Sequence, residues 1–259
     1  MPAELKSTSR GRTMVLTLCN PEHHNALGPE MYAAGIEALS VAESSPDVRS
    51  VVIAGDGKLF SAGGNLRRLQ ANRQLPPEVQ SQHIEGLHGW IEAVRTFPKP
   101  IIAAVEGAAA GAAFSLALAC DFIVAAEDAA FVMAYSNVAL SPDGGATWAL
   151  ARSIPRQLAT ELLMLGERMG ARRLHELGLV NRVAAPGAAL DDALAMAERL
   201  NARAPNALAS IKELLNDADG ATLTRHLTNE RDHFVRNLHH ANAGIGMAAF
   251  LAKQPPRYE

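Results

Sequence analysis

The sequence predicts an α/β fold in which a core of alternating strands and helices is followed by a helical C-terminal region. Short apolar runs alternate with segments of helical spacing in the first part of the chain, and the last part shows helical patterns alone. The 259 residues suffice for one large domain or for a main domain with an appendage. We place the boundary at Pro186-Gly187, with a core over residues 1–187 and a helical region over residues 188–259.

Composition indicates an ordinary soluble globular protein. Hydrophobic residues make up 48% of the chain and charged residues 20%, which excludes disordered and fibrous classes. The 24 Lys and Arg against 27 Asp and Glu give a net charge of −3. A balance this close to neutral lacks the basic surface that binds a phosphate backbone, so we expect no nucleic-acid partner.

Cysteine usage and the N-terminal residues predict a cytoplasmic protein. Cys19 and Cys120 stand apart from any CxxC or Cys/His cluster, which favours buried thiols in a reducing compartment and no metal site. The first residues are polar and lack the apolar core of a signal peptide. The longest apolar run, Gly107–Cys120, is shorter than the ~20 residues that a membrane span requires, so we expect no membrane contact.

The first predicted elements follow in the order strand, helix, strand. Met14–Leu18 is an apolar strand that Asn20-Pro21 ends, because proline lacks an N–H donor and restricts the residue before it. Pro29–Ala42 begins with a proline suited to a first helical turn and keeps helical spacing. Val48–Ala54 is β-branched and runs into a Gly-Asp-Gly turn, as strands do.

The middle of the chain continues this alternation. Gln82–Phe97 carries one apolar helical stripe, which Pro98 and Pro100 end. A short buried strand is expected at Ile101–Val105. A helix is expected to open at Gly107 and run to Ala119, followed at once by a strand over Phe122–Ala126.

The remaining segments are less regular before the helical end. The polar stretch 67–80 shows no period and receives no assignment, and Phe131–Leu140 is expected to be extended. A loop follows at Ser141–Ala146. The later helices are predicted over residues 147–152, 156–165, 171–176, 190–202, 206–217 and 221–241.

Two glycine turns carry the strongest local signal for chemistry. Gly63-Gly64 lets the backbone approach a ligand because no Cβ stands in the way. Gly111 and Ala112 lie at the start of a helix, whose unpaired N–H groups point toward negative charge. Together they could form an oxyanion hole with two donors. The alternative is that each glycine only permits a tight turn or close helix packing.

Several motifs in fixed order resemble the crotonase, or enoyl-CoA hydratase/isomerase, superfamily. The order and spacing of these motifs over nearly the whole chain make the resemblance specific. They are Asn20-Pro21 with Asn25-Ala-Leu27, Phe60-Ser-Ala-Gly-Gly-Asn-Leu66, Lys99-Pro-Ile-Ile-Ala-Ala-Val-Glu-Gly107 with Gly111, Cys120-Asp121, Glu176-Leu-Gly-Leu-Val180 and Ala249-Phe-Leu-Ala-Lys253.

The resemblance implies a spiral of ββα units with a C-terminal helical trimerisation region, assembled as a homotrimer or a dimer of trimers. It implies an acyl-CoA thioester as substrate and no cofactor, since CoA is part of the substrate. By motif position, the N–H groups of Gly64 and Ala112 would hold the thioester oxygen. The residues implied to contact CoA are Ala26, Ala62, Asn65, Leu66, Phe234, Phe250 and Lys253.

The departures from the family pattern point to one branch of it. Ser115 and Tyr135 occupy the places of the two glutamates with which hydratases of the family add water. Asp143 stands where double-bond isomerases of the family place a single acid, and one base facing an oxyanion hole can move a proton from the α- to the γ-carbon. We therefore expect an acyl-CoA isomerase, with Ser115 and Tyr135 shaping the acyl pocket. Alternatively, Asp143 is only a turn residue before two glycines.

Two other functions remain open at this point. A dehalogenase or thioesterase of the same superfamily would use Asp143 as nucleophile and His88 to activate water, and His88 lies beside the apolar stripe of its predicted helix. A lone histidine there is more often a packed or surface residue. The third reading is an acyl-CoA binder that has lost catalysis, since both glutamates are missing.

Overall fold

Two β-sheets organise the computed structural model, which describes residues 3–258. The larger sheet has the order β1-β2-β3-β4-β6-β9, with β1 antiparallel to β2 and every other pair parallel. Its strands are β1 (Glu4–Arg10), β2 (Thr13–Cys19), β3 (Ser50–Gly55), β4 (Ile101–Val105), β6 (Phe122–Ala126) and β9 (Arg182–Ala184). The smaller sheet consists of β5 (Ala108–Ala110), β7 (Ala130–Val132) and β8 (Arg168–Gly170).

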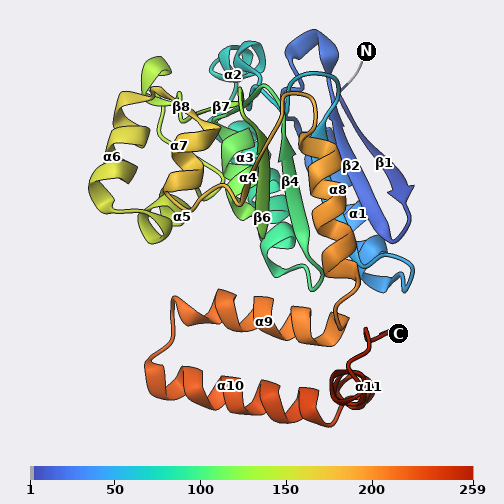
Figure 1. Cartoon of the computed structure of the whole chain (residues 1–259). Helices are drawn as coiled ribbons and strands as arrows, with labels where there is room; N and C mark the ends of the chain where they lie inside the picture. The colour runs from blue at the N-terminus through green and yellow to red at the C-terminus, as the bar shows by residue number, and fades with distance from the viewer. Residues whose placement is uncertain (1–2, 259) are drawn as a thin grey trace.

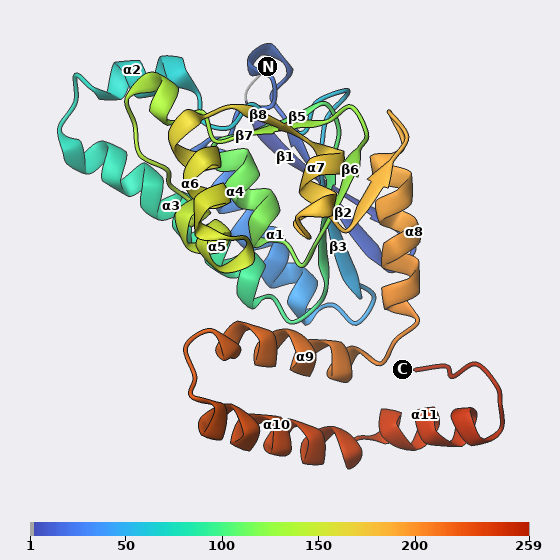
Figure 2. The ribbon, with the colours of Figure 1, turned by 60° about the vertical axis from the view of Figure 1, so that its left-hand side comes forward.

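Helices cover both faces of the larger sheet, and three more form a separate layer beneath it (Figures 1 and 2). α8 lies on one face, while α1, α3 and α4 lie on the other side of the sheet. The core helices are α1 (Pro29–Ser44), α2 (Leu66–Asn72), α3 (Pro77–Thr96), α4 (Ala112–Ala119), α5 (Ala146–Ser153), α6 (Arg156–Leu165), α7 (Ala171–Glu176) and α8 (Ala189–Asn201). The separate layer contains α9 (Pro205–Ala218), α10 (Leu223–Leu238) and α11 (Ala241–Leu251), and two short 3-10 helices are Pro21–His23 and Ser136–Val138.

The central parallel strands form the core. Every residue of β4 is buried, and so are all residues of β3 except Gly55. Parallel strands with helices on both faces have no solvent side, which is why these segments read as continuous apolar runs. The strands predicted over residues 101–105 and 122–126 are confirmed with the same boundaries.

The predicted helix from Gly107 begins later than expected. Ala108–Ala110 forms strand β5, paired with β7, and the helix starts at Ala112. Alanine has high helix propensity, but backbone pairing within the smaller sheet overrides it here. Gly111, with φ of 50°, makes the turn between strand and helix.

Other differences arise where tertiary contacts decide the structure. Of the stretch 131–140, expected to be extended, only the first residues belong to β7, and Ser136–Val138 is a 3-10 helix. The unassigned stretch 67–80 contains α2 and the first turn of α3. The helix predicted over residues 221–241 ends at Leu238, and α11 begins at Ala241, where His240 caps it by accepting from Asn242 N.

The predicted linker at Pro186-Gly187 is a turn held by Glu106. The Glu106 carboxylate accepts from Gly187 N at 3.0 Å and from Ala189 N at 2.7 Å. α8 then buries Ala193 and Ala197 against the sheet, so it packs with the α/β core. The chain passes to the separate helical layer after α8. The assignment of functional domains to residues 1–187 and 188–259 stays a prediction.

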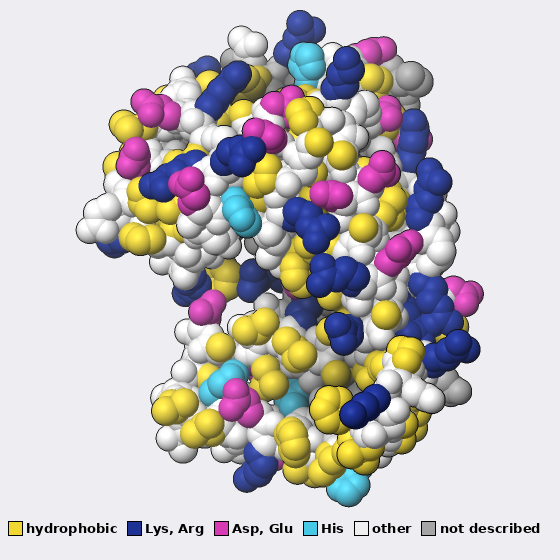
Figure 3. All heavy atoms as spheres, in the orientation of Figure 1, with side chains coloured by type: hydrophobic (Ala, Val, Ile, Leu, Met, Phe, Trp, Pro, Cys, Tyr) yellow, Lys and Arg dark blue, Asp and Glu magenta, His cyan; other side chains and the backbone are white. Residues whose placement is uncertain are grey.

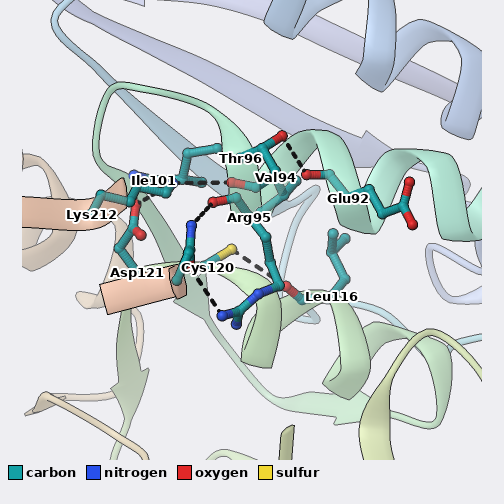
Figure 4. Close-up of polar contacts among 10 residues, drawn as sticks. Glu92, Val94, Arg95, Thr96, Ile101, Leu116, Cys120, Asp121 and Lys212 are labelled. Carbon is teal, nitrogen blue, oxygen red and sulfur yellow. Dashed lines mark hydrogen bonds and ion pairs between the residues drawn. The ribbon is translucent and has the colours of Figure 1, made fainter. Parts of the chain in front are cut away.

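A polar cluster attaches α9 to the core (Figure 4). Lys212 Nζ lies 2.8 Å from Asp121 Oδ2 and donates to Val94 O at 3.0 Å. The same Asp121 oxygen accepts from Ile101 N at 2.8 Å. Burial raises the pKa of Asp121, and Lys212 acts in the opposite direction. Lys212 therefore compensates a carboxylate that is largely removed from water.

Lys212→Met should lower the free energy of unfolding by about 2–3 kcal/mol, less than a fully buried pair would lose because Asp121 keeps some solvent contact. Because the pKa of Asp121 is raised in the folded state, its protonated form favours folding, and this contribution is lost as the pH rises through that pKa. Lys212 lowers this pKa, so its removal makes the ionised form of Asp121 costlier still, and the deficit should be larger at neutral pH than in acid. Urea denaturation at both pH values measures it, with the exposed Lys58→Met as control. Equal loss in the two variants would contradict the prediction.

Candidate active site

A cavity of about 440 Å³ opens between α2, α3, the start of α4 and the loop before α5. It brings together five of the six residues predicted for catalysis and the acyl pocket, namely Gly64, His88, Ala112, Tyr135 and Asp143. Asp143 is the only carboxylate among the described residues that line it. The cavity therefore holds the residues that the predicted chemistry requires.

Two backbone loops meet at the cavity wall. Gly63 has φ of 82°, and a Cβ added to it would overlap the carbonyl oxygen of Ala110 and lie 3.3 Å from Ala112 N. Only glycine permits this approach. The preceding Ser61 is buried and pairs with Ala109 as a parallel bridge, which fixes the two loops side by side.

Hydrogen bonds orient the two candidate amides. The Gly63 carbonyl accepts from Leu27 N at 2.8 Å, and the Gly111 carbonyl accepts from Ser115 N at 3.0 Å. In a trans peptide the N–H points opposite to the carbonyl of the same unit. The N–H groups of Gly64 and Ala112 thus point away from these partners, and both residues line the cavity. Ala112 is also the first residue of α4, where the N–H has no partner within the helix.

The Asp143 carboxylate lies in the cavity and is held by a tyrosine. Tyr135 donates from its hydroxyl to Asp143 Oδ1 at 2.6 Å. Burial first, and the charge of Asp143 second, raise the pKa of Tyr135 well above its ordinary value. The phenol therefore stays protonated and serves as donor. In the turn that follows, Ala146 N approaches the main-chain oxygen of Asp143 at 3.3 Å, so the carboxylate is not used to make the turn.

Ser115 contacts the main chain of this turn from α4. It is buried on α4, and its hydroxyl donates to the main-chain oxygen of Asp143 at 3.0 Å. Ser115 lines a neighbouring cavity instead of the one that holds Asp143. Its predicted place in the acyl pocket is thus indirect in this structure, while Tyr135 lines the pocket directly.

The residues predicted to contact CoA fall into two groups. Ala62 and Leu66 line the cavity, and Asn65 caps α2 by accepting from two backbone N–H groups. Ala26 is buried beside this region and does not line the cavity. The other three, Phe234, Phe250 and Lys253, belong to the separate helical layer or directly follow it, away from the cavity in Figures 1 and 2. One copy of the chain does not bring them to the cavity, and their contact with CoA stays a prediction.

Sequence reasoning did not single out Tyr32 or His83, which form part of the cavity wall. Tyr32 lines the cavity, and burial raises its pKa to about 12. Arg68 lines it too and donates to Leu27 O at 2.8 Å. Gln80 ends the stretch 67–80 that received no assignment, and His83 lies in the segment predicted as a helix. Only the histidine, five residues before His88 on the same helix, offered a signal in the sequence.

The described residues offer neither a metal-ligating cluster nor a membrane-spanning helix. Within residues 3–258, no group of three or more His, Cys, Asp or Glu side chains is arranged to hold a metal ion. Among the same residues, no helix has both the length and the apolar character needed to cross a bilayer.

Convergent main-chain amides facing one carboxylate are typical of enzymes that stabilise a carbonyl oxygen as it gains negative charge. The family model for enoyl-CoA hydratase/isomerase matches residues 9–259, and the chain belongs to this family. Its crotonase fold is confirmed by a solved structure of an enoyl-CoA hydratase from a Polaromonas species, with a TM-score of 0.98 and 69% identity over 98% of this chain and 99% of that one.

Relatives in the family carry different activities in their names. The 1,2-epoxyphenylacetyl-CoA isomerase of Escherichia coli is 35% identical over 95% of this chain and 94% of its own length. The 2,3-dehydroadipyl-CoA hydratase of the same organism is 30% identical over 99% of both chains. Membership of the family therefore does not by itself specify which reaction the chain catalyses.

The contact between Tyr135 and Asp143 can be tested by titration. Asp143→Asn removes a negative charge that raises the pKa of Tyr135, so this tyrosine should ionise at lower pH in the variant than in the wild type. Ultraviolet absorbance of tyrosinate follows the change, and Tyr135→Phe identifies which transition belongs to this residue. Identical titration of the wild type and Asp143→Asn would show that the two groups do not interact.

Proposed function

We propose that the protein is an acyl-CoA isomerase that moves a double bond from the 3- to the 2-position of an enoyl thioester. The observation that carries this proposal is the single carboxylate of Asp143 in a cavity that also receives the amides of Gly64 and Ala112. A hydration that uses two glutamates has no counterpart here, because Ser115 and Tyr135 stand at those places.

The reaction requires one base and one oxyanion site. The thioester oxygen accepts hydrogen bonds from Gly64 N–H and Ala112 N–H, and each such donor typically contributes about 10²–10³ in rate. The Asp143 carboxylate takes a proton from the α-carbon, and the electron pair of that C–H bond delocalises into a dienolate whose charge rests on the thioester oxygen. The protonated Asp143 then returns the proton to the γ-carbon, which leaves the double bond conjugated with the thioester.

Tyr135 positions the base without ionising. Its hydroxyl holds one carboxylate oxygen at 2.6 Å, which leaves the other oxygen available for the substrate proton. A proton shuttle between two carbons of one substrate needs the carboxylate to remain within reach of both positions. The name of the Escherichia coli isomerase relative supports an isomerase assignment.

The C-terminal layer supports the proposed assembly. Exposed apolar side chains gather on α9, α10 and α11, and Figure 3 shows hydrophobic side chains over this part of the molecule. Phe234 and Phe250 are 68% and 83% exposed. A surface with this many exposed large apolar groups favours self-association. We propose that the protein assembles as a homotrimer or a dimer of trimers in the cytoplasm. In this assembly a neighbouring copy would bring Phe234, Phe250 and Lys253 into contact with CoA.

His88 keeps a second candidate function open. It lines the same cavity as Asp143, as a dehalogenase or thioesterase that activates water would require. In a thioesterase the Asp143 carboxylate would attack the thioester carbon and expel CoA as the thiolate; in a dehalogenase it would attack the halogen-bearing ring carbon and expel halide. Water deprotonated by His88 would then cleave the resulting anhydride or ester, which releases the acid or the hydroxylated product and restores the Asp143 carboxylate. A protein that only binds acyl-CoA would turn over neither kind of substrate.

The wild-type reaction can be read directly from thioester absorbance. Offered a 3-enoyl-CoA, the enzyme should produce the conjugated 2-enoyl thioester, and offered a 2-enoyl-CoA it should add no water. Release of free CoA is measured in parallel with a thiol reagent. Hydration of the 2-enoyl substrate, or hydrolysis in place of isomerisation, would contradict the proposal.

Two substitutions separate the roles of Asp143 and His88. Asp143→Asn should lower kcat of isomerisation by about 10²–10⁴, the usual contribution of a general acid or base. His88→Ala should lower kcat of isomerisation by less than about tenfold, because His88 transfers no proton in the proposed isomerase mechanism. Stopped-flow absorbance measures both variants, with unfolding midpoints as a check of the fold. Comparable losses in the two variants would favour the hydrolytic mechanism.

A further inference from the structure

A second cavity of about 400 Å³ lies beside the proposed active site and takes no part in the mechanism above. It is formed between α3, α4 and the start of α5, and His88 lines both cavities. Its wall combines apolar side chains with charged ones, among them Ile91, Glu92, Arg95, Leu118 and Trp148.

The two cavities follow one another along the same pair of helices. On α4, Ala112 lines the first cavity and Ala119 the second; on α3, Ile84 lines the first and Arg95 the second. The seven residue steps from Ala112 to Ala119 span about 10 Å of helix. An acyl chain held at Ala112 N–H and extended along these helices would reach the second cavity beside His88, which lines both.

Arg95 brings to this cavity a positive charge that has no direct carboxylate partner among the described residues; at longer range it helps to lower the pKa of Asp121. Its guanidinium lies 4.6 Å from the centroid of the Trp148 ring, and it donates once to Asn216 Oδ1 at 3.0 Å. Within the described residues, no Asp or Glu oxygen lies within 4.0 Å of it. The nearby Asp121 is already paired with Lys212, and Arg152, the other guanidinium on Trp148, is paired with Asp219.

Glu92 lines the same cavity but does not neutralise Arg95. The two side chains extend in different directions from α3 in Figure 4. Glu92 is exposed to solvent, whereas Arg95 is half-buried. A guanidinium has five N–H donors, and the hydrogen bond to Asn216 occupies one of them. The other donors of Arg95 remain for a ligand.

We propose that this second cavity binds the far end of the acyl group and that Arg95 recognises a terminal carboxylate there. The substrates would then be CoA thioesters of enoyl acids with a second carboxyl group at the opposite end. The apolar walls suit a methylene chain, and the planar guanidinium, held against Trp148, suits a carboxylate. The inference rests on the proposed isomerase function and names its substrate class.

The test compares two 3-enoyl-CoA substrates of equal chain length, one ending in a methyl group and one in a carboxylate, over a short series of lengths. At one or more lengths the wild type should show a kcat/KM at least about tenfold higher for the carboxylate, and Arg95→Met should reduce this ratio by roughly tenfold to a hundredfold. Arg152→Met, which removes the other guanidinium from Trp148, is the matched control and should keep the ratio. A wild-type ratio near one, or equal changes in both variants, would overturn the inference.

A binding measurement separates this inference from the isomerase proposal. Calorimetry with the saturated forms of the same two thioesters gives their Kd values without turnover. If no isomerisation occurs but the Kd ratio depends on Arg95, only the proposed reaction fails; if isomerisation occurs and the ratio ignores Arg95, only the inference fails. Arg95→Gln retains an amide donor toward Asn216 and replaces Arg95→Met if the latter does not fold.

Discussion

The site depends on the close approach of two backbone loops at Gly63 and Ala110. A side chain at Gly63 would separate them, and the amides of Gly64 and Ala112 would no longer face one cavity. The partners that orient these amides belong to the fold itself: Leu27 N on the first loop and the first turn of α4 on the second. The oxyanion site that we propose for these amides would be preorganised in this way, because backbone dipoles are fixed before charge develops.

Two neutral side chains hold Asp143 in the proposed isomerase site. Tyr135 and Ser115 stand where the resemblance to the family places the two glutamates of a hydratase; the first donates to the Asp143 carboxylate and the second to the main-chain oxygen of the same residue. Both substitutions therefore turn toward Asp143 and fix its position. Hydration by two glutamates needs two carboxylates near a water. Among the described residues that line this cavity, Asp143 supplies the only carboxylate, and its hydrogen-bond donor Tyr135 is neutral.

Much of this arrangement could be predicted from the sequence, because its signals are local. The strands over residues 101–105 and 122–126 and the two glycine turns were indicated by residue type and spacing, whereas Asp143 was indicated by the resemblance to the family. The strand at Ala108–Ala110 was not, because its pairing with β7 overrides the helix propensity of alanine. The edge strand β1 was missed for a related reason: its residues are mostly exposed and lack an apolar face. The bond between Tyr135 and Asp143, and the separation of Ser115 from the first cavity, depend on tertiary packing that no short pattern encodes.

Helix α3 explains why both cavities can keep defined shapes. Its inner face is anchored in the core, where Trp90 and Val94 are fully buried and the Trp90 ring lies 6.2 Å from that of Tyr32. With 3.6 residues per turn, anchoring this face fixes the direction of the others, so His88 and Arg95, both half-buried, are presented to the cavities at set positions along one rigid element. The same amphipathic pattern that stabilises the core thus positions the polar groups that line the ligand space. A site built on a packed helix holds its geometry better than one built on a loop, and this gives the second cavity the same structural support as the first.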